Sequence, residues 1–374
     1  MKKDQGFWPA TMYLEGLDQY RGWFQSSLLT AVGAFGEGAP FKECVTHGWT
    51  VDGEGRAMHK SLGNGVDPAD IFNENGADIL RLWAASADYH ADVRCSKAIF
   101  QQLSQNYLKF RNTCKFMLDN LVDFDPAHLT KAEDMPVLDR WLITKLNELI
   151  EKVEQSYNDY EFHIITHAVN DFCVTTLSSF YLDIVKDRLY CEAADSAERR
   201  SAQTALYLTL STLAKLFAPI LAFTCDEIWL AMPHTAEDDA RNVVLNDMNK
   251  PFTAYALDAE TMARWEHIIE VRTAVNGALE EARAAKVIGK SLEADVHLTV
   301  PEGDVFLADE NPAALADLFI VSKVELTVGG ELAVKVENAA GTKCPRCWKH
   351  SLTPNAEGLC PRCAEVVRHL PDLL

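Results

Sequence analysis

Apolar residues recur every three or four positions over long stretches of the chain, the spacing that gathers them on one face of an α-helix. Between residues 94 and 120 this spacing predicts one amphipathic helix. From 137 to 232 it predicts three or four more long helices. Their expected ranges are 137–157, 161–185, 197–216 and 219–230, with Pro219 breaking or kinking the last pair. A helical bundle is therefore expected in the middle of the chain.

The pattern is different before residue 92, where short apolar runs alternate with glycine-rich turns. It predicts a helix over 21–32 and a strand over 43–51, followed by a hairpin turn at 52–55. A further helix is expected to start at Asp67, because aspartate caps a first turn well and Pro68 suits the first helical position. This mixture predicts the last part of an α/β domain.

After a polar stretch at 232–249, which is interpreted as an exposed loop, helical and strand patterns alternate again. Helices are expected over 261–285 and 312–319, and a strand over 294–300. Two more strands, 323–328 and 332–336, are expected to pair with each other across Gly329 and Gly330. These segments predict a small α/β domain.

A length of 374 residues exceeds one ordinary hydrophobic core, so a multi-domain, mainly α-helical protein is expected. The predicted domains are the end of an α/β domain (1–92), a connecting helical region with a linker (93–136), the helical bundle (137–250), the small α/β domain (251–340) and a cysteine-rich segment (341–374).

The composition is that of a soluble globular protein, with 48% hydrophobic and 24% charged residues. No apolar run approaches the ~18 residues of a membrane span, and the N-terminus lacks the apolar core of a signal peptide. A cytoplasmic protein with no membrane contact is therefore expected. The formal net charge of -20 argues against indiscriminate binding to nucleic acid. Basic residues do gather at 94–115 and 343–368, where they are interpreted either as RNA-contacting stripes or as solvated helix faces.

Four of the ten cysteines have the spacing of a metal site. Cys344 and Cys347 form one Cys-x-x-Cys pair, and Cys360 and Cys363 form a second after twelve intervening residues. This arrangement predicts one structural Zn²⁺ held by four thiolates, with no open position for catalysis. A redox pair and a chance arrangement are the alternatives. The remaining cysteines are expected to be reduced thiols.

The stretch 56–64 places the cation of Lys60 in a small glycine- and hydroxyl-bearing loop. Gly63 and Gly65 remove the Cβ atoms that would keep the backbone from an anion, Ser61 adds a hydroxyl and Lys60 adds a compact ammonium. Such a loop suits a polyphosphate, although taken alone it is more often an ordinary surface turn.

Together with the upstream blocks 13–24 and 46–52, this loop resembles the KMSKS signature of the bacterial isoleucyl-tRNA synthetases, a family of class I aminoacyl-tRNA synthetases. Met58, Lys60 and Ser61 fit the signature, whereas Ala57 and His59 depart from it. The blocks 138–141, 180–190, 217–220 and 226–229 resemble the anticodon-binding helical domain of the same class. The resemblance implies that residues 1–92 are the end of a Rossmann-like catalytic domain.

The resemblance also implies a reaction and a site. Isoleucine would attack the α-phosphorus of ATP, with Mg²⁺, and the adenylate would then acylate tRNA(Ile). Lys60 and Ser61 are the expected catalytic residues, since a positioned cation stabilises charge that develops on phosphate. The residues expected to contact the adenylate or amino acid are Glu15, Asp18, Gln19, Trp23, His47, Gly48 and Lys60. Alternative interpretations remain: Trp23 as core, Asp18 as a helix cap and His47 as a packed histidine.

The bacterial isoleucine enzymes end in a similar zinc segment, which favours isoleucine over valine or leucine. Trp348, Lys349 and Arg362 are candidates for contact with RNA, and a monomer is expected. No HIGH-type tetrapeptide occurs in the chain, so a C-terminal fragment that is inactive alone is expected. The alternatives are a zinc-capped RNA-binding module without catalysis and an unrelated zinc-ribbon protein.

Overall fold

The computed structural model describes residues 8–36, 38–304, 307 and 310–370. The chain divides into two compact units. Unit 1 consists of Met1–Arg111, Lys152–Asn170 and Phe217–Cys225, and unit 2 of Asn112–Glu151, Asp171–Leu216 and Asp226–Leu374. Among the described residues, no helix combines the length and apolar character that crossing a membrane requires.

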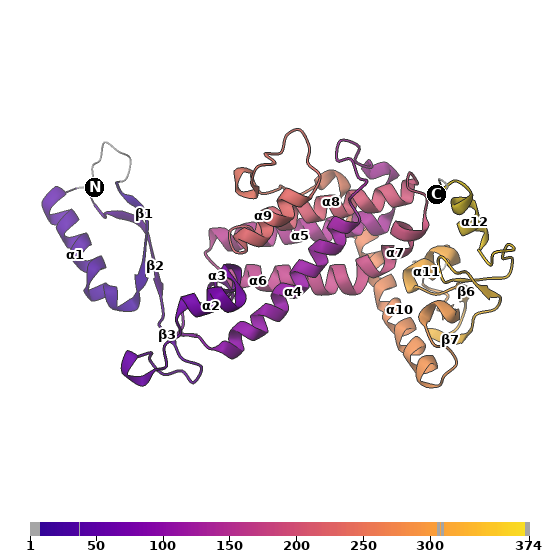
Figure 1. Cartoon of the computed structure of the whole chain (residues 1–374), viewed down its shortest axis with the longest axis horizontal. Coiled ribbons are helices and arrows are strands. Elements are labelled where there is room, and N and C mark those ends of the chain that lie inside the picture. The colour runs from indigo at the N-terminus through magenta and orange to yellow at the C-terminus, as the bar shows by residue number, and fades with distance from the viewer. Residues whose placement is uncertain (1–7, 37, 305–306, 308–309, 371–374) are drawn as a thin grey trace. The chain divides into compact units, whose positions relative to one another are not determined.

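The first part of the chain mixes short strands and helices (Figure 1). The elements in order are β1 (Ala10–Gly16), η2 (Leu17–Arg21), α1 (Trp23–Thr30), η3 (Ala31–Phe35), β2 (Phe41–His47), β3 (Thr50–Val51), η4 (Lys60–Leu62), α2 (Pro68–Asn75), α3 (Ala77–Ser86), β4 (Val93–Arg94) and α4 (Lys97–Asp119). Strand β1 pairs in parallel with β2, and β3 in parallel with β4. The predicted mixture of strands and helices is confirmed, as are the helices within 21–32 and 94–120.

Helix α2 begins as its sequence predicts. Asp67 accepts a hydrogen bond from Ala69 N at 2.9 Å, and Pro68 occupies the first helical position. The buried side of α2 and α3 packs with Cys95 and Phe100 into one apolar cluster, which Met58 and Trp83 also join. The segment that follows the loop is therefore anchored to a real core.

The single strand predicted over 43–51 is wrong, because Gly48 and Trp49 separate β2 from β3. Gly48 N donates to Tyr89 O at 2.8 Å, and Trp49 N donates to the Asp92 carboxylate at 2.8 Å. A Cβ at position 48 would lie only 2.3 Å from Ala91 O. The backbone thus bends to meet another loop at close range, which glycine alone permits. The turn predicted at 52–55 is confirmed, with an antiparallel bridge between residues 51 and 57.

The middle of the chain is helical, as predicted. Its elements are η5 (Ala132–Asp134), α5 (Val137–Asn158), α6 (Phe162–Asp171), η6 (Phe172–Tyr181), α7 (Leu182–Cys191), α8 (Ala197–Phe217) and α9 (Ala222–Ala231). Pro219 falls in the break between α8 and α9. The helix predicted over 161–185 continues to Cys191, and its middle third, η6, is a π-helix. There Ser179 Oγ donates to the carbonyl of Val174, five residues earlier, at 2.8 Å.

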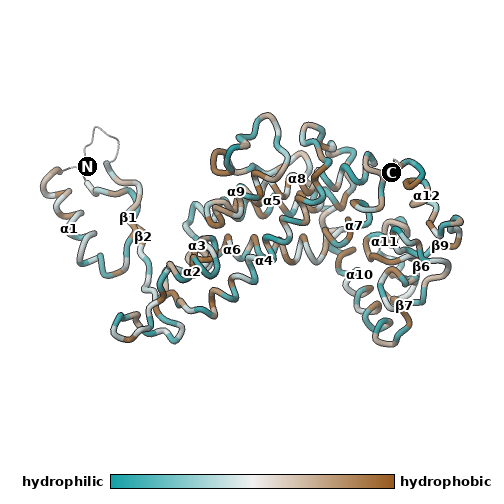
Figure 2. The backbone as a smooth tube through the Cα atoms, in the orientation of Figure 1, coloured by the Kyte–Doolittle hydropathy of each residue, from teal (hydrophilic) through white to brown (hydrophobic). Residues whose placement is uncertain are grey.

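Within unit 2, α5, η6, α7 and α8 contribute to a core of closely packed apolar side chains. Trp141 of α5 meets Phe180 of η6 edge to face, with ring centroids 4.8 Å apart. Leu142, Leu146, Leu206 and Leu210 have no exposed surface. Figure 2 shows apolar and polar residues alternating along α5 and α7, as amphipathic helices require, whereas residues 201–214 of α8 are all buried, so α8 lies inside this core.

The helices and strands predicted after residue 250 are present, but one strand pairing was predicted wrongly. Its elements are η7 (Val243–Leu245), η8 (Thr253–Tyr255), α10 (Ala259–Ala284), η9 (Ser291–Glu293), β5 (Ala294–Val300), α11 (Pro312–Phe319), β6 (Lys323–Val328) and β7 (Ala333–Asn338). Strands β6 and β7 do not pair with each other, because β5 lies between them, parallel to β6 and antiparallel to β7. The four alternate residues of β5 that face the core are fully buried, which agrees with its place as the central strand of the sheet.

The last part of the chain contains β8 (Thr342–Lys343), β9 (His350–Ser351) and α12 (Pro361–Arg368). Strands β8 and β9 pair antiparallel, which brings the two ends of the first Cys-x-x-Cys turn together.

Unit 1 exposes several large apolar side chains near the parallel pair β1 and β2. Leu14 is 55% exposed, Trp49 54% and Phe35 65%. Parallel strands in α/β proteins are normally covered on both faces. The exposure agrees with the prediction that residues 1–92 are the last part of an α/β domain.

Candidate functional site

The ends of β1 and β2 gather several of the predicted site residues. The register places Glu15 beside Thr46 and Gly16 beside His47, so both strands finish at the same edge. A Cβ at position 16 would lie 2.9 Å from Asp18 Oδ1 and 3.8 Å from His47 Cε1. Asp18 and His47 therefore converge on Gly16. The region beyond the carboxyl ends of parallel strands is where α/β proteins bind ligands.

The residues after β1 form a small hydrogen-bonded turn. Gln19 Nε2 donates to Asp18 Oδ2 at 3.1 Å, and Gln19 Oε1 accepts from Trp23 N at 2.8 Å. Gln19 thus caps the start of α1, so the alternative interpretation of Asp18 as that cap is wrong. The Asp18 side chain is exposed and stays available to a ligand.

Trp23 is not a core residue, because 52% of its surface is exposed. Its ring stacks on Tyr13 at 5.6 Å between centroids, with the ring planes 24° apart. Together with Ser27, Thr30 and Phe35 these two rings border a hollow of about 340 Å³. The position suits a flat apolar wall of a binding pocket.

His47 Nδ1 lies 2.8 Å from the carbonyl oxygen of Gly48, and the ring borders a second, mostly apolar hollow of about 670 Å³. Leu14, Val45 and Tyr89 also border this hollow. Gly48 itself is explained by the close approach of Ala91 described above. The predicted contact of Gly48 with a ligand therefore has a structural alternative.

The loop that carries Lys60 is built around the buried carboxylate of Asp52. That carboxylate accepts hydrogen bonds from Glu54 N at 3.0 Å, Arg56 N and Nε at 2.9 Å each, and Asn64 Nδ2 at 3.0 Å. The Asn64 side chain and the backbone of Arg56 contribute most to holding the pKa of Asp52 well below its ordinary value. An ionised Asp52 is therefore the natural state of the folded loop.

Asn64 closes the loop from the other end. Its Oδ1 accepts from His59 N at 2.9 Å, and its Nδ2 also donates to Ala57 O at 3.1 Å. Between these anchors η4 is a single 3-10 turn that ends at Gly63, whose φ of 62° is left-handed. The loop is fixed at its base while Lys60 and Ser61 project from its tip.

Lys60 is exposed, and no ion pair to its ammonium occurs among the described residues. No hydrogen bond in the described part of the chain joins Lys60 or Ser61 to the group at the ends of β1 and β2. The predicted site residues therefore lie in two separate groups, one at the strand ends and one at the tip of the loop.

Asp52 and the anchoring role of Asn64 were not predicted. A sequence signal existed, since aspartate at the start of a glycine-rich turn commonly accepts hydrogen bonds from the backbone that follows it.

We expect Asp52→Asn to loosen the loop, because an amide keeps only one of the two acceptor oxygens and loses the negative charge that strengthens the bonds from Arg56 and Asn64. Hydrogen exchange at residues 53–64 should become faster, whereas Glu54→Gln, which alters only an exposed pair with Arg56, should leave it unchanged. A lowered carboxyl pKa adds stability above the ordinary value of 3.8, and this stability is lost as pH falls through the folded value. Protection of the wild-type loop should thus persist from pH 8 to pH 4 and disappear only under stronger acid. Equal exchange in Asp52→Asn and wild type would contradict this role.

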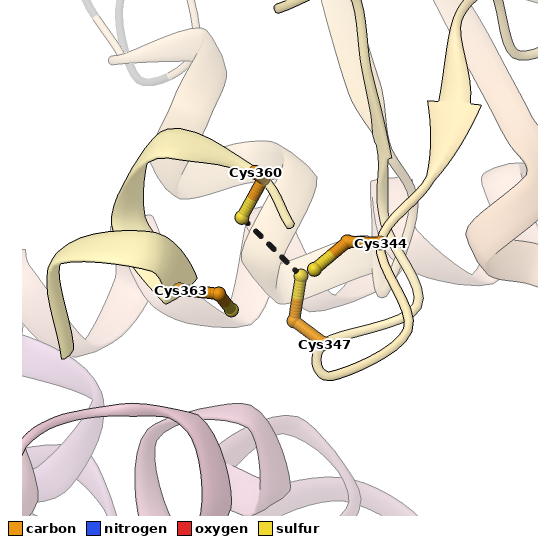
Figure 3. Close-up of side chains that lie close together, drawn as sticks. All are labelled: Cys344, Cys347, Cys360 and Cys363. Carbon is orange, nitrogen blue, oxygen red and sulfur yellow. Dashed lines mark hydrogen bonds between the residues drawn. The ribbon is translucent and has the colours of Figure 1, made fainter. Parts of the chain in front are cut away.

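The four cysteines of the predicted metal site come together. Figure 3 shows Cys344 and Cys347 on the β8–β9 turn facing Cys360 and Cys363 at the start of α12. All four Sγ atoms lie within 4.8 Å of one another, and Cys347 Sγ is 3.7 Å from Cys360 Sγ. Three of the four residues are buried. The donor set and its spacing fit one tetrahedral Zn²⁺ with every position filled by sulfur.

The backbone prepares one of these thiols for metal binding. Burial opposes ionisation, but hydrogen bonds from the backbone of Cys347, Cys360 and Arg346 outweigh it and lower the pKa of Cys344 to about 6. A thiolate at neutral pH is the form that binds metal.

The basic residues around the metal site are bound within the protein. Arg362 pairs with Asp187 and Glu192, and Lys349 pairs with Asp317. Trp348 is 53% exposed, with Lys290 Nζ 5.3 Å from the ring centre. Of the three predicted RNA contacts, Trp348 is the one that presents a large free surface.

Comparisons with known proteins cover both units. Residues 1–96 match the family described as tRNA synthetases class I (I, L, M and V), and residues 139–298 match the anticodon-binding domain of tRNA ligase. The isoleucine–tRNA ligase of Moorella thermoacetica is 47% identical over 97% of the chain, and that of Syntrophotalea carbinolica is 47% identical over 98%. The chain spans 41% of the length of each.

Solved structures agree at the level of the fold. A LeuRS–tRNA–LeuAMS complex from Agrobacterium radiobacter K84 matches 88% of the chain and 32% of its own length, with a TM-score of 0.50 and 16% identity. Methionyl-tRNA synthetase of Mycobacterium tuberculosis bound by methionyl-adenylate matches 62% of the chain and 45% of its own length, with a TM-score of 0.51 and 19% identity.

Proposed function

Since the chain belongs to the isoleucine–tRNA ligase family of class I tRNA synthetases, we propose that it supplies the phosphate-contacting loop and the tRNA-binding helices of such an enzyme. The substrates would be isoleucine, ATP with Mg²⁺, and tRNA(Ile). Residues 1–92 would be the end of the Rossmann-like catalytic domain, 93–136 the connecting region, and 137–250 the anticodon-binding bundle. The small α/β domain (251–340) and the zinc segment (341–374) would complete the tRNA-binding side.

One observation carries the catalytic part of the proposal. The Lys60 ammonium stands on a loop that Asp52 and Asn64 fix at its base, and it has no internal counter-ion among the described residues. In the reaction, the isoleucine carboxylate attacks the α-phosphorus of ATP and pyrophosphate leaves with the electron pair of the broken P–O bond. Negative charge grows on the departing phosphate oxygens, and a prepositioned cation lowers the barrier for this step. Ser61 would donate its hydroxyl to the same phosphates.

The strand ends would hold the other half of the adenylate. Glu15 and Asp18 are exposed acceptors suited to ribose hydroxyls or to the amino group of isoleucine, and Gln19 links Asp18 to the start of α1. His47 and Gly48 would border the adenosine side. Trp23 would form an apolar wall for the branched side chain, where one methylene changes binding by only ~1–3 kcal/mol.

Zinc would be bound by Cys344, Cys347, Cys360 and Cys363, where it would act as a structural ion that holds the two Cys-x-x-Cys turns together. We propose a cytoplasmic monomer, with tRNA as the macromolecular partner of the helical and zinc-binding parts.

A second candidate is a tRNA-binding module without catalysis. It is favoured by the match of residues 139–298 to the anticodon-binding domain of tRNA ligase, which covers more of the chain than the match of residues 1–96 to the class I tRNA synthetases.

A chimaera can distinguish the two candidate functions. In this chimaera the chain replaces the matching segment of the Moorella thermoacetica enzyme, covalently joined to the rest of that enzyme. If the chain supplies half of the active site, the chimaera catalyses isoleucine-dependent exchange of pyrophosphate into ATP, with valine about 10–200-fold less effective. A folded chimaera that binds tRNA(Ile) but exchanges no pyrophosphate would support the second candidate instead. The parental enzyme is the positive control.

A further inference from the structure

Both Cys-x-x-Cys turns contain the same pair of residues, proline followed by arginine, and both arginines contact helix α7. Arg346 donates from Nη1 to the carbonyl of Cys191 and from Nη2 to the carbonyl of Tyr190, the latter at 3.3 Å. These are the last two residues of α7, whose terminal carbonyls have no partner within the helix. Arg346 is thus a cationic cap on the carboxyl end of α7.

The same guanidinium reaches the metal site. Arg346 Nη1 lies 3.8 Å from Cys363 Sγ, within the range of a hydrogen bond to sulfur. The bond would be charge-assisted once this sulfur is a thiolate. One side chain therefore connects a metal ligand to the end of a helix more than 150 residues earlier in the chain.

Arg362 contacts two acidic side chains at the same end of α7. Its Nη1 and Nη2 bind the Asp187 carboxylate at 2.5 and 2.8 Å, and Nη1 also donates to Glu192 at 2.8 Å. The Asp187 and Glu192 side chains are only 24% and 20% exposed. Two partly buried carboxylates at a helix carboxyl end are unfavourable without a counter-charge, and Arg362 provides it.

Apolar packing joins the same parts. Cys191, the last residue of α7, shares one buried cluster with Cys344, Cys347, Leu359 and Cys363. Its thiol donates to the carbonyl of Arg346 at 3.7 Å. The end of α7 and the cysteine turns thus form a single small core.

We propose that Arg346 and Arg362 couple metal binding to the order of the last turn of α7, and that they are positioning residues rather than contacts for RNA. Without a metal, only apolar packing and the contact between Cys347 and Cys360 keep the two pairs of thiols together, so the frame that fixes the arginines becomes weaker. The last carbonyls of α7 then lose their cap, and the carboxylates of Asp187 and Glu192 lose their counter-charge. Because coupling is reciprocal, the docked helix also raises the affinity for the metal.

The coupling extends into the bundle core of unit 2. Arg188 follows Asp187 in the same turn of α7 and pairs with the buried Asp139 of α5. Loss of the metal should therefore increase hydrogen exchange mainly at the end of α7 and only weakly in α5. This inference does not depend on catalysis by the chain.

The test uses the full chain loaded with Zn²⁺ and the same chain after chelation, compared by hydrogen exchange. We expect chelation to speed exchange at residues 185–192 at least about tenfold and to leave 142–150 almost unchanged. In Arg346→Ala/Arg362→Ala all four cysteines remain, so one Zn²⁺ should still bind, with an affinity 10–100-fold lower, the range for residues that support metal ligands. Exchange at 185–192 in this variant should be fast with or without metal.

Arg368→Ala is the matched control, since Arg368 lies on α12 and pairs only with exposed Glu365 among the described residues. Should the double variant fail to fold, Arg362→Lys keeps the charge but removes the bidentate contact, and it should give a smaller change in the same direction. Metal-independent exchange at 185–192 in the wild-type chain would overturn the proposal. So would unchanged zinc affinity in a folded arginine variant, and a loss of tRNA affinity without any change in zinc affinity would assign the arginines to RNA instead.

Discussion

Pyrophosphate exchange by the chimaera should fall about 10²-fold or more when Lys60 is replaced by alanine, because one prepositioned cation is lost from the departing phosphates. The ammonium has no internal ion pair among the described residues, so its removal should change the stability of the fold very little. The decrease should appear in kcat, with the KM for isoleucine nearly unchanged, since the lost interaction belongs to the transition state. Steady-state exchange at several isoleucine concentrations measures both.

Lys97→Ala is the control for this experiment. Lys97 is also an exposed lysine of unit 1, and its pair with Glu74 is of the surface kind that contributes little. An equal rate for wild type and Lys60→Ala would contradict the assignment of Lys60. An equal decrease in Lys97→Ala would show that net charge, rather than position, matters.

Asp139→Ala should lower the free energy of unfolding of unit 2 by about 3–5 kcal/mol, because it leaves the Arg188 cation without its partner in the core. Asp139 has no exposed surface. It accepts hydrogen bonds from Tyr181 at 2.8 Å, Ser201 at 2.5 Å and Arg188 at 3.2 Å. Burial, with the neighbouring charge of Asp139, raises the pKa of Tyr181 well above its ordinary value, so the phenol stays a donor. The slowest-exchanging amides of α5 and α8 within unit 2 report the change.

Two further variants make this test specific. Asp183→Asn removes an exposed pair with Lys186 in the same unit and should change the free energy of unfolding by less than about 1 kcal/mol. Adding Arg188→Met to Asp139→Ala should recover part of the loss, since the unpaired charge is gone. A loss under about 1 kcal/mol in Asp139→Ala itself would mean that the network contributes no net stability.

Local signals in the sequence predicted most of the helices correctly. Period and capping are properties of neighbouring residues, so Asp67 with Pro68 marks the start of α2 and Pro219 marks the gap between α8 and α9. The cluster of four cysteines was also predicted correctly, because a metal site requires a characteristic spacing of its ligands.

The errors arose where distant parts of the chain decide the local structure. Strands β6 and β7 were predicted to pair because one glycine pair separates them, but the buried strand β5 lies between them. The strand over 43–51 breaks at Gly48, because the backbone at Ala91 approaches it. Neither the position of β5 nor the approach of Ala91 can be predicted from the spacing of apolar residues in the neighbouring sequence.

The site was only partly predictable for the same reason. Lys60, Ser61 and the strand-end residues are predictions from the family resemblance, whereas the Asp52 anchor became visible only in the folded loop. The contacts of Arg346 and Arg362 with α7 span more than 150 residues of sequence, and a basic residue beside a cysteine turn is more readily taken for an RNA contact.

Transfer of radiolabelled isoleucine to a tRNA(Ile) transcript by the chimaera requires both the loop of unit 1 and the tRNA-binding parts, so it examines the proposed function as a whole. We expect ATP-dependent charging that falls with Lys60→Ala and persists with Lys97→Ala. The proposed function is wrong if a folded, zinc-loaded chimaera binds the transcript but leaves it uncharged while the parental enzyme charges it.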